Sequence, residues 1–133
     1  MNIQVIRPED VKAVYRFWLK DYKVDGRDSV ERITNFVEKN PGISMLAIEG
    51  DNVVGTCLGS YDGRKGYIYK IVISKEFYGT GLGRKIVVKT LDNIRSAGGL
   101  DVRVQCAPEL VGFYEKCGFK VKEGVIHMQW KGY

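Results

Sequence analysis

Apolar and polar residues follow two patterns along this chain, a helical periodicity and strand-like runs, and their order predicts its helices and strands. Residues 11–22 place an apolar side chain every three or four positions, which is typical of an amphipathic helix with one buried face. Residues 28–39 show the same spacing, and Asp28 and Glu31 are three residues apart, as in a capping box at a helix start. Runs of β-branched and aromatic residues separated by short turns then predict an antiparallel meander. These runs span residues 43–49, 52–61 and 67–74.

The rest of the chain predicts one crossover and a closing hairpin. A helical stripe follows a glycine-rich loop and stops at Gly98. The remaining elements are a strand at residues 101–106, a short helix from residue 108 to 114 and a hairpin at 120–130. With a first strand at residues 2–6, the expected order is β-α-α-β-β-β-α-β-α-β-β. This order predicts an α/β (α+β) fold with a mixed, mostly antiparallel sheet of six to seven strands, flanked by about four helices.

Length and composition narrow the class of protein. A chain of 133 residues with 44% hydrophobic and 28% charged residues is expected to form one domain over residues 1–133. No apolar run approaches the roughly 20 residues of a membrane span, and the start of the chain lacks the pattern of a signal peptide. Three widely spaced cysteines predict no disulfide framework, so we expect a cytoplasmic protein without membrane partners.

Charge is spread rather than clustered. The net charge is +5, but lysines and arginines alternate with acidic residues, which is typical of a solvated surface and predicts no nucleic-acid partner. A modest positive excess also suits a small polyanionic ligand. The single histidine, His127, offers no metal cluster, so no metal is expected.

The glycine-rich loop at residues 78–83 reads Tyr-Gly-Thr-Gly-Leu-Gly and runs directly into the predicted helix. It lacks the Gly-Lys-Ser/Thr ending of a P-loop. A dinucleotide fold needs its third glycine one residue later and a parallel sheet before the loop. A simple tight turn does not need three glycines. The spacing instead suggests that the backbone itself is the working surface, with its N–H groups turned toward a ligand still to be identified.

Two segments carry a resemblance to a known family. Residues 72–91 resemble the acetyl-CoA motif of the GNAT superfamily of N-acetyltransferases, and residues 109–119 resemble its Phe-Tyr-Glu-Lys-x-Gly-Phe element. The two lie in the order and at the separation expected for the family. The resemblance implies an enzyme that moves an acetyl group from acetyl-CoA, its cosubstrate, to a primary amine. Transfer is expected to be direct, through a tetrahedral intermediate.

The same resemblance implies roles for individual residues. The loop would hold the pyrophosphate of coenzyme A, and the strand edge at residues 71–73 would pair with its pantetheine arm. The backbone N–H of Ile71 would polarise the acetyl carbonyl, and Tyr114 would act as general acid toward the departing thiolate. The implied cofactor-binding residues are Ile71, Val72, Ile73, Tyr78, Gly79, Thr80, Gly81, Leu82, Gly83 and Arg84. Two positions depart from the family pattern: Tyr78 replaces the usual Arg or Gln, and Ala107 stands where the family often has Asn.

The general base stays open at this level. The strand at residues 67–74 has no carboxylate where relatives often place a glutamate. Tyr69, Glu109, His127 and a water relay are all conceivable. Cys106 would allow a covalent route, but a buried structural cysteine is the favoured interpretation.

The acceptor is the least determined part. Arg27, Arg64 and Tyr69 lie in segments expected to contact it, and it is expected to be a small-molecule or peptide amine. Residues 105–119 are also similar to glucosamine-phosphate acetyltransferases, although the carboxylates of that subfamily are absent from the fourth strand. A catalytically silent acyl-CoA-binding or interaction domain is the alternative. The chain is expected to be a monomer or a homodimer.

Overall fold

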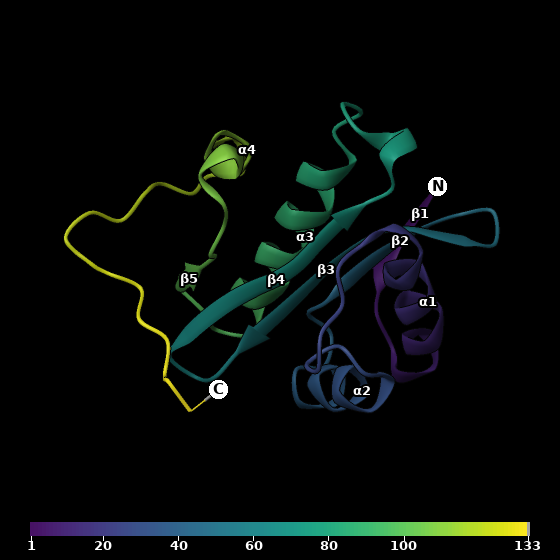
Figure 1. The fold of residues 1–133 in the computed structure, drawn as a ribbon, viewed down its shortest axis with the longest axis horizontal. Coiled ribbons are helices and arrows are strands. Elements are labelled where there is room, and N and C mark those ends of the chain that lie inside the picture. The colour runs from purple at the N-terminus through teal and green to yellow at the C-terminus, as the bar shows by residue number, and fades with distance from the viewer. Residues whose placement is uncertain (133) are drawn as a thin grey trace.

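A mixed sheet forms the centre of the protein, whose structure, a computed structural model, describes residues 1–132 apart from the side chain of residue 21. Within this part of the chain the sheet has five strands in the order β1-β2-β3-β4-β5 (Figure 1). Strands β1 to β4 pair antiparallel and β5 pairs parallel to β4. The strands are β1 (Asn2–Val5), β2 (Met45–Glu49), β3 (Asn52–Tyr61), β4 (Lys65–Ile73) and β5 (Asp101–Arg103). The predicted mixed, mostly antiparallel sheet is therefore confirmed.

Helices cover both faces of the sheet, and each helix buries its apolar side against it. They are α1 (Val11–Asp21), α2 (Val30–Lys39), α3 (Leu82–Ser96) and α4 (Val111–Lys116), with 3-10 turns η1 (Pro8–Asp10), η2 (Lys75–Phe77) and η3 (Pro108–Leu110). Helices α1 and α2 share one core with Leu46 and Leu58 of the sheet. Helices α3 and α4 share the other with Met45 and Ile68. Figure 1 shows α1 and α2 in front of the sheet and α3 behind it.

The start of α2 differs from the prediction by one residue. Ser29, not Asp28, is the N-cap, because its side chain accepts a hydrogen bond from the Arg32 N–H at 3.2 Å. Asp28 instead lies buried and pairs with Lys70 of β4. The expected capping box is therefore wrong, because a long-range ion pair claims the acidic side chain.

The closing hairpin is also absent from the described residues, so the predicted count of six to seven strands is wrong for them. The chain after α4 forms a loop without strands that projects outward and then turns back (Figure 1). Phe119 packs on the core, but between residues 121 and 130 the large apolar side chains are exposed, Ile126 by 87% and Trp130 by 81%. Strand β5 at the sheet edge is only 3 residues long and offers a short ladder for further pairing.

Candidate active site

Strands β4 and β5 pair over three positions only and then part. Their ladder joins Lys65 to Asp101, Gly66 to Val102 and Tyr67 to Arg103. Strand β4 continues for six more residues, 68–73, beyond this ladder. On that side β5 does not pair with β4, so in the described structure this edge of β4 has no neighbouring strand beyond Tyr67. This opening leads directly toward the glycine loop.

The loop turns from β4 into α3 through left-handed backbone at two positions. Gly79 has φ +76° and Gly81, the N-cap of α3, has φ +86°. A left-handed conformation is costly for residues with a Cβ, so glycine is required at both. A Cβ built at either position meets no heavy atom within 4 Å, which means that the space above the loop is open. The Thr80 hydroxyl tightens the turn by donating to the Phe77 carbonyl at 2.6 Å.

Gly83 has a different reason for being glycine. A Cβ at this position would lie 3.2 Å from the Phe113 ring and 3.4 Å from Ile73. The missing side chain lets the first turn of α3 pack against α4 and the end of β4. The sequence predicted that all three glycines clear the way for a ligand, whereas this third position is filled by the protein itself.

The start of α3 is suited to an anion. Its first turn contains no acidic residue, and Arg84 and Lys85 of the same turn are exposed. The first N–H groups of a helix lack intrahelical partners and lie at the positive end of its dipole. Open space, the positive end of a helix dipole and nearby cations together fit a phosphate-bearing ligand.

Tyr114 lies inside the second motif, on α4, and only 7% of it is exposed. Its ring makes edge contacts with Phe113 at 5.0 Å and Phe119 at 5.9 Å between centroids. Burial, with smaller contributions from neighbouring thiols, raises the pKa of Tyr114 to about 12. The hydroxyl therefore keeps its proton over the whole physiological range.

The three cysteines differ in exposure. Cys57 and Cys117 are buried, and burial raises the pKa of Cys57 to about 12, so this thiol stays neutral. Cys106 is exposed. The expectation of a buried Cys106 is wrong, because β5 ends at Arg103 and the chain leaves the sheet before residue 106.

Aromatic side chains line β4 on the side of α1 and α2. The rings of Tyr67 and Tyr69 stack with centroids 6.0 Å apart, and Phe36 of α2 meets Tyr69 edge-on at 5.9 Å. Tyr69 is 44% exposed, and partial burial raises its pKa. It is therefore protonated at neutral pH, which makes it a poor general base.

The other proposed acceptor and base residues are dispersed. Arg27 is exposed and pairs with Asp25 at 2.6 Å, which holds the pKa of that carboxyl well below its usual range. Arg64 lies in the turn between β3 and β4, at the end of β4 opposite the glycine loop, about 30 Å away at the rise of a strand. Arg64 was expected to contact the acceptor rather than the loop, and that role stays a prediction.

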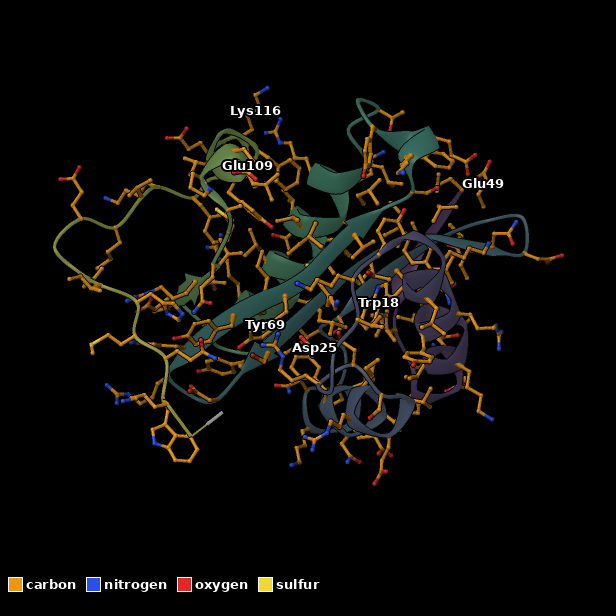
Figure 2. All side chains as sticks on the ribbon, in the orientation of Figure 1. Trp18, Asp25, Glu49, Tyr69, Glu109 and Lys116 are labelled. Carbon is orange, nitrogen blue, oxygen red and sulfur yellow. The ribbon has the colours of Figure 1, made fainter. Side chains whose placement is uncertain are left out.

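Neither proposed ionisable base on the C-terminal side is buried. Glu109 and His127 are both exposed, and His127 has its Nδ1 3.1 Å from the Gln105 amide. Figure 2 shows Tyr69 near the middle of the sheet and Glu109 away from it, beside α4. Among the described residues no group of three or more His, Cys, Asp or Glu is placed to hold a metal.

Two residues near the opening were missed by sequence reasoning. Lys70 of β4 has φ +49°, and its ammonium pairs with Asp28 at 3.0 Å. The loop composition carried no signal for this pair, because a lysine in a strand and an aspartate before a helix ordinarily have local or solvent partners.

The chain is an α/β domain whose sheet opens beside a glycine-capped helix start, and comparison with known proteins gives its family. Residues 20–130 match the model of the acetyltransferase (GNAT) domain, so the chain belongs to this family. No helix of the described part is long and apolar enough to cross a membrane.

Individual relatives point the same way. Over 60 residues the chain is 40% identical to glucosamine 6-phosphate N-acetyltransferase 1 of Oryza sativa subsp. japonica, a match covering 45% of this chain and 36% of that protein. The structure resembles glucosamine-6-phosphate N-acetyltransferase from Arabidopsis thaliana with a TM-score of 0.73 at 22% identity, covering 98% and 97% of the two chains. It also resembles the PaiA N-acetyltransferase of Thermoplasma acidophilum, solved with coenzyme A, with a TM-score of 0.74 at 15% identity, covering 93% and 92%.

Proposed function

We propose that this protein is an acetyl-CoA-dependent N-acetyltransferase that acetylates a primary amine by direct transfer. One observation carries the proposal: the β4–β5 ladder ends at Tyr67 and Arg103, and the free edge of β4 leads to the open start of α3. An extended pantetheine arm fits an unpaired strand edge, and a pyrophosphate fits a helix start.

The binding residues follow from this placement. Ile71, Val72 and Ile73 form the last part of the free edge, where we place the pantetheine contacts. The loop from Tyr78 to Gly83, with Arg84, holds the pyrophosphate. Acetyl-CoA supplies the acetyl group as an activated thioester, and the remaining tasks fall to the chain.

Two groups of the chain are assigned to the chemistry. The Ile71 backbone N–H lies where β4 bulges, and donation from it would stabilise negative charge on the acetyl oxygen. Tyr114 holds its proton because of burial and would donate to the departing sulfur. The exposed Cys106 is not needed for a direct transfer.

The general base is best assigned to water, which would pass the proton of the amine to the bulk solvent. Strand β4 carries no carboxylate, and the buried Asp28 is already paired with Lys70. Tyr69 is protonated at neutral pH. The lack of a side chain that can serve as base also favours the second candidate function, a domain that binds acyl-CoA without turnover.

The relatives suggest which class of amine acceptor to test first. The similarity to glucosamine 6-phosphate N-acetyltransferases makes an amino-sugar phosphate the first amine to test. The aromatic group of Phe36, Tyr67 and Tyr69 can stack on a sugar face or on a planar amine. A panel should therefore include glucosamine 6-phosphate, arylalkylamines and a peptide N-terminus.

The deciding experiment is calorimetric titration with acetyl-CoA on wild type and on Gly81→Asn. Asparagine tolerates left-handed backbone better than other residues with a Cβ, so this variant fills the open space at modest backbone cost. We expect the Kd to rise at least tenfold. Gly63→Asn is the matched control, since Gly63 has φ +95° and open surroundings in the β3–β4 turn. Unchanged binding in Gly81→Asn would remove the loop from the cofactor site.

Turnover separates the enzyme from the silent binder. Release of CoA thiol in the presence of an amine, above the rate without it, is expected for the enzyme. Tight binding of acetyl-CoA without thiol release from any amine of the panel would favour the binding domain.

A further inference from the structure

The middle of β4 contains an irregularity that no motif explains. Among the residues described, Lys70 is the one non-glycine residue with positive φ. The β3–β4 register passes from Leu58–Tyr69 to Thr56–Val72, so Cys57 faces both Lys70 and Ile71. This is a β-bulge, in which one residue of the longer strand stays unpaired and the strand bends. A lysine in left-handed backbone is strained and must be held by its surroundings.

The Lys70 side chain is held from three directions. Its ammonium lies 3.0 Å from a carboxylate oxygen of Asp28, and only 22% and 9% of the two side chains are exposed. It also donates to the backbone carbonyl of Lys23. Finally, it lies 5.1 Å from the centre of the Trp18 ring, within the range of a cation–π interaction.

The backbone of the bulge is tied to the same tryptophan. The Thr56 hydroxyl donates to the Lys70 carbonyl at 3.1 Å and accepts from the Trp18 indole N–H at 3.0 Å. Thr56 and Trp18 are both fully buried, so these bonds are protected from water. The bulge is thus fixed to α1 through polar contacts inside the core.

The partners of Lys70 on the other side belong to a single loop. Residues 22–29 connect α1 to α2 and supply both Lys23 and Asp28. At the start of this loop the Tyr22 hydroxyl donates to the Ile73 carbonyl at 3.0 Å. The loop is therefore fastened at two points of β4, at Lys70 just before and at Ile73 at the end of the stretch proposed to contact the pantetheine arm.

We infer that the Lys70–Asp28 ion pair is a positioning device that holds the 22–29 loop closed on the β4 bulge. It thereby fixes the acceptor side of the site relative to the Ile71 N–H. This effect on the acceptor side, unlike closure of the loop itself, rests on the proposed acetyltransferase function. A small misplacement of a reactant costs up to about 100-fold in rate, which is why a clamp at this distance from the chemistry matters.

The test compares three lysine variants and one aspartate variant. Lys70→Met keeps an apolar stem near Trp18 but lacks the charge, whereas Lys70→Arg keeps the charge. Asp28→Asn removes the partner. Lys12→Met replaces an exposed lysine of α1 and is the control for loss of one positive charge.

Closure of the loop is measured without any substrate. Trypsin can cut after Lys23 and Arg27, and cleavage needs an opened loop. We expect the initial cleavage rate to rise about tenfold in Lys70→Met and Asp28→Asn, and to stay near wild type in Lys70→Arg and Lys12→Met. Wild-type cleavage rates in the first two variants would overturn the clamp.

Kinetics test the effect on the site. With an amine accepted by the wild type, kcat/KM for the acceptor is expected to fall about tenfold in Lys70→Met, with the Kd for acetyl-CoA within twofold. Arginine at position 70 should restore most of the rate. A parallel loss of acetyl-CoA affinity would instead show collapse of β4 and overturn the positioning role.

The double variant Asp28→Asn/Lys70→Met tests whether the two residues act as one pair. It should be no worse than the more damaged single variant, whereas additive losses would refute a shared function. If the wild type acetylates no amine, the proposed acetyltransferase function fails, and with it the proposed positioning of the acceptor side of the site. The cleavage rates still decide whether the pair holds the loop.

Discussion

Replacing Tyr114 by phenylalanine isolates the role of one hydroxyl group. The ring is 7% exposed and meets Phe113 and Phe119 edge-on, so phenylalanine keeps these contacts and leaves no cavity. Alanine at the same position would cost about 3–5 kcal/mol, as for other buried aromatics, and would confound stability with activity. Phenylalanine is therefore the informative change.

The expected loss of rate follows from the pKa of the hydroxyl. A positioned general acid contributes about 10²–10⁴-fold to a rate. Burial raises the pKa of Tyr114 to about 12, above the usual value near 10, so the group is a weaker acid than a free tyrosine. We therefore expect the lower end, a fall in kcat of about 100-fold or less, which corresponds to about 2.7 kcal/mol in the barrier.

The assay follows thiol release at saturating acetyl-CoA, with the Kd measured separately by calorimetry. The raised pKa also fixes the pH profile, since Tyr114 stays protonated below about pH 11 and causes no alkaline loss of rate under that value. The reasoning is refuted if the variant keeps wild-type kcat. It is also refuted if kcat and acetyl-CoA affinity fall together, since Tyr114 would then serve packing or binding.

Three further predictions concern stability and reactivity. Gly59→Ala should lower the free energy of unfolding by about 1–3 kcal/mol in urea titrations, because its Cβ would lie 2.6 and 2.7 Å from two methyl groups of the core; no change would show that the core yields. Under native conditions iodoacetamide should label Cys106 well before the buried Cys57, as read by mass spectrometry, and Cys106→Ser should keep its transfer activity; an inactive serine variant would revive the covalent route. Hydrogen bonds from neighbouring groups lower the pKa of Asp62 and Asp101, so their contribution is present above the unfolded value of about 3.9 and is lost as pH falls below it. The melting temperature should therefore drop below about pH 4, less steeply in Asp62→Asn, and an equal drop in that variant would assign the effect to other groups.

Local patterns in the sequence determined most of the elements and the location of the loop. The helical stripes of α1 and α3 and the meander from β2 to β4 lie where periodicity predicted them. Gly79 and Gly81 have left-handed backbone, a local property that favours glycine, while their role in cofactor binding stays a prediction. Boundaries were less accurate: β5 ends at Arg103 rather than residue 106, because the chain leaves the sheet there although β4 runs on to Ile73.

Only the tertiary structure decided how these elements make a site. The β4–β5 opening depends on how far two strands pair, which neither strand encodes alone. Gly83 is small because Phe113 of a distant helix packs on it. Asp28 was predicted to cap a helix but pairs with Lys70, 42 residues further along the chain, and this pair holds a bulge that propensity argues against. Sequence periodicity reports the face that each element buries, whereas long-range contacts of polar and glycine residues depend on packing between elements that meet only in the folded chain.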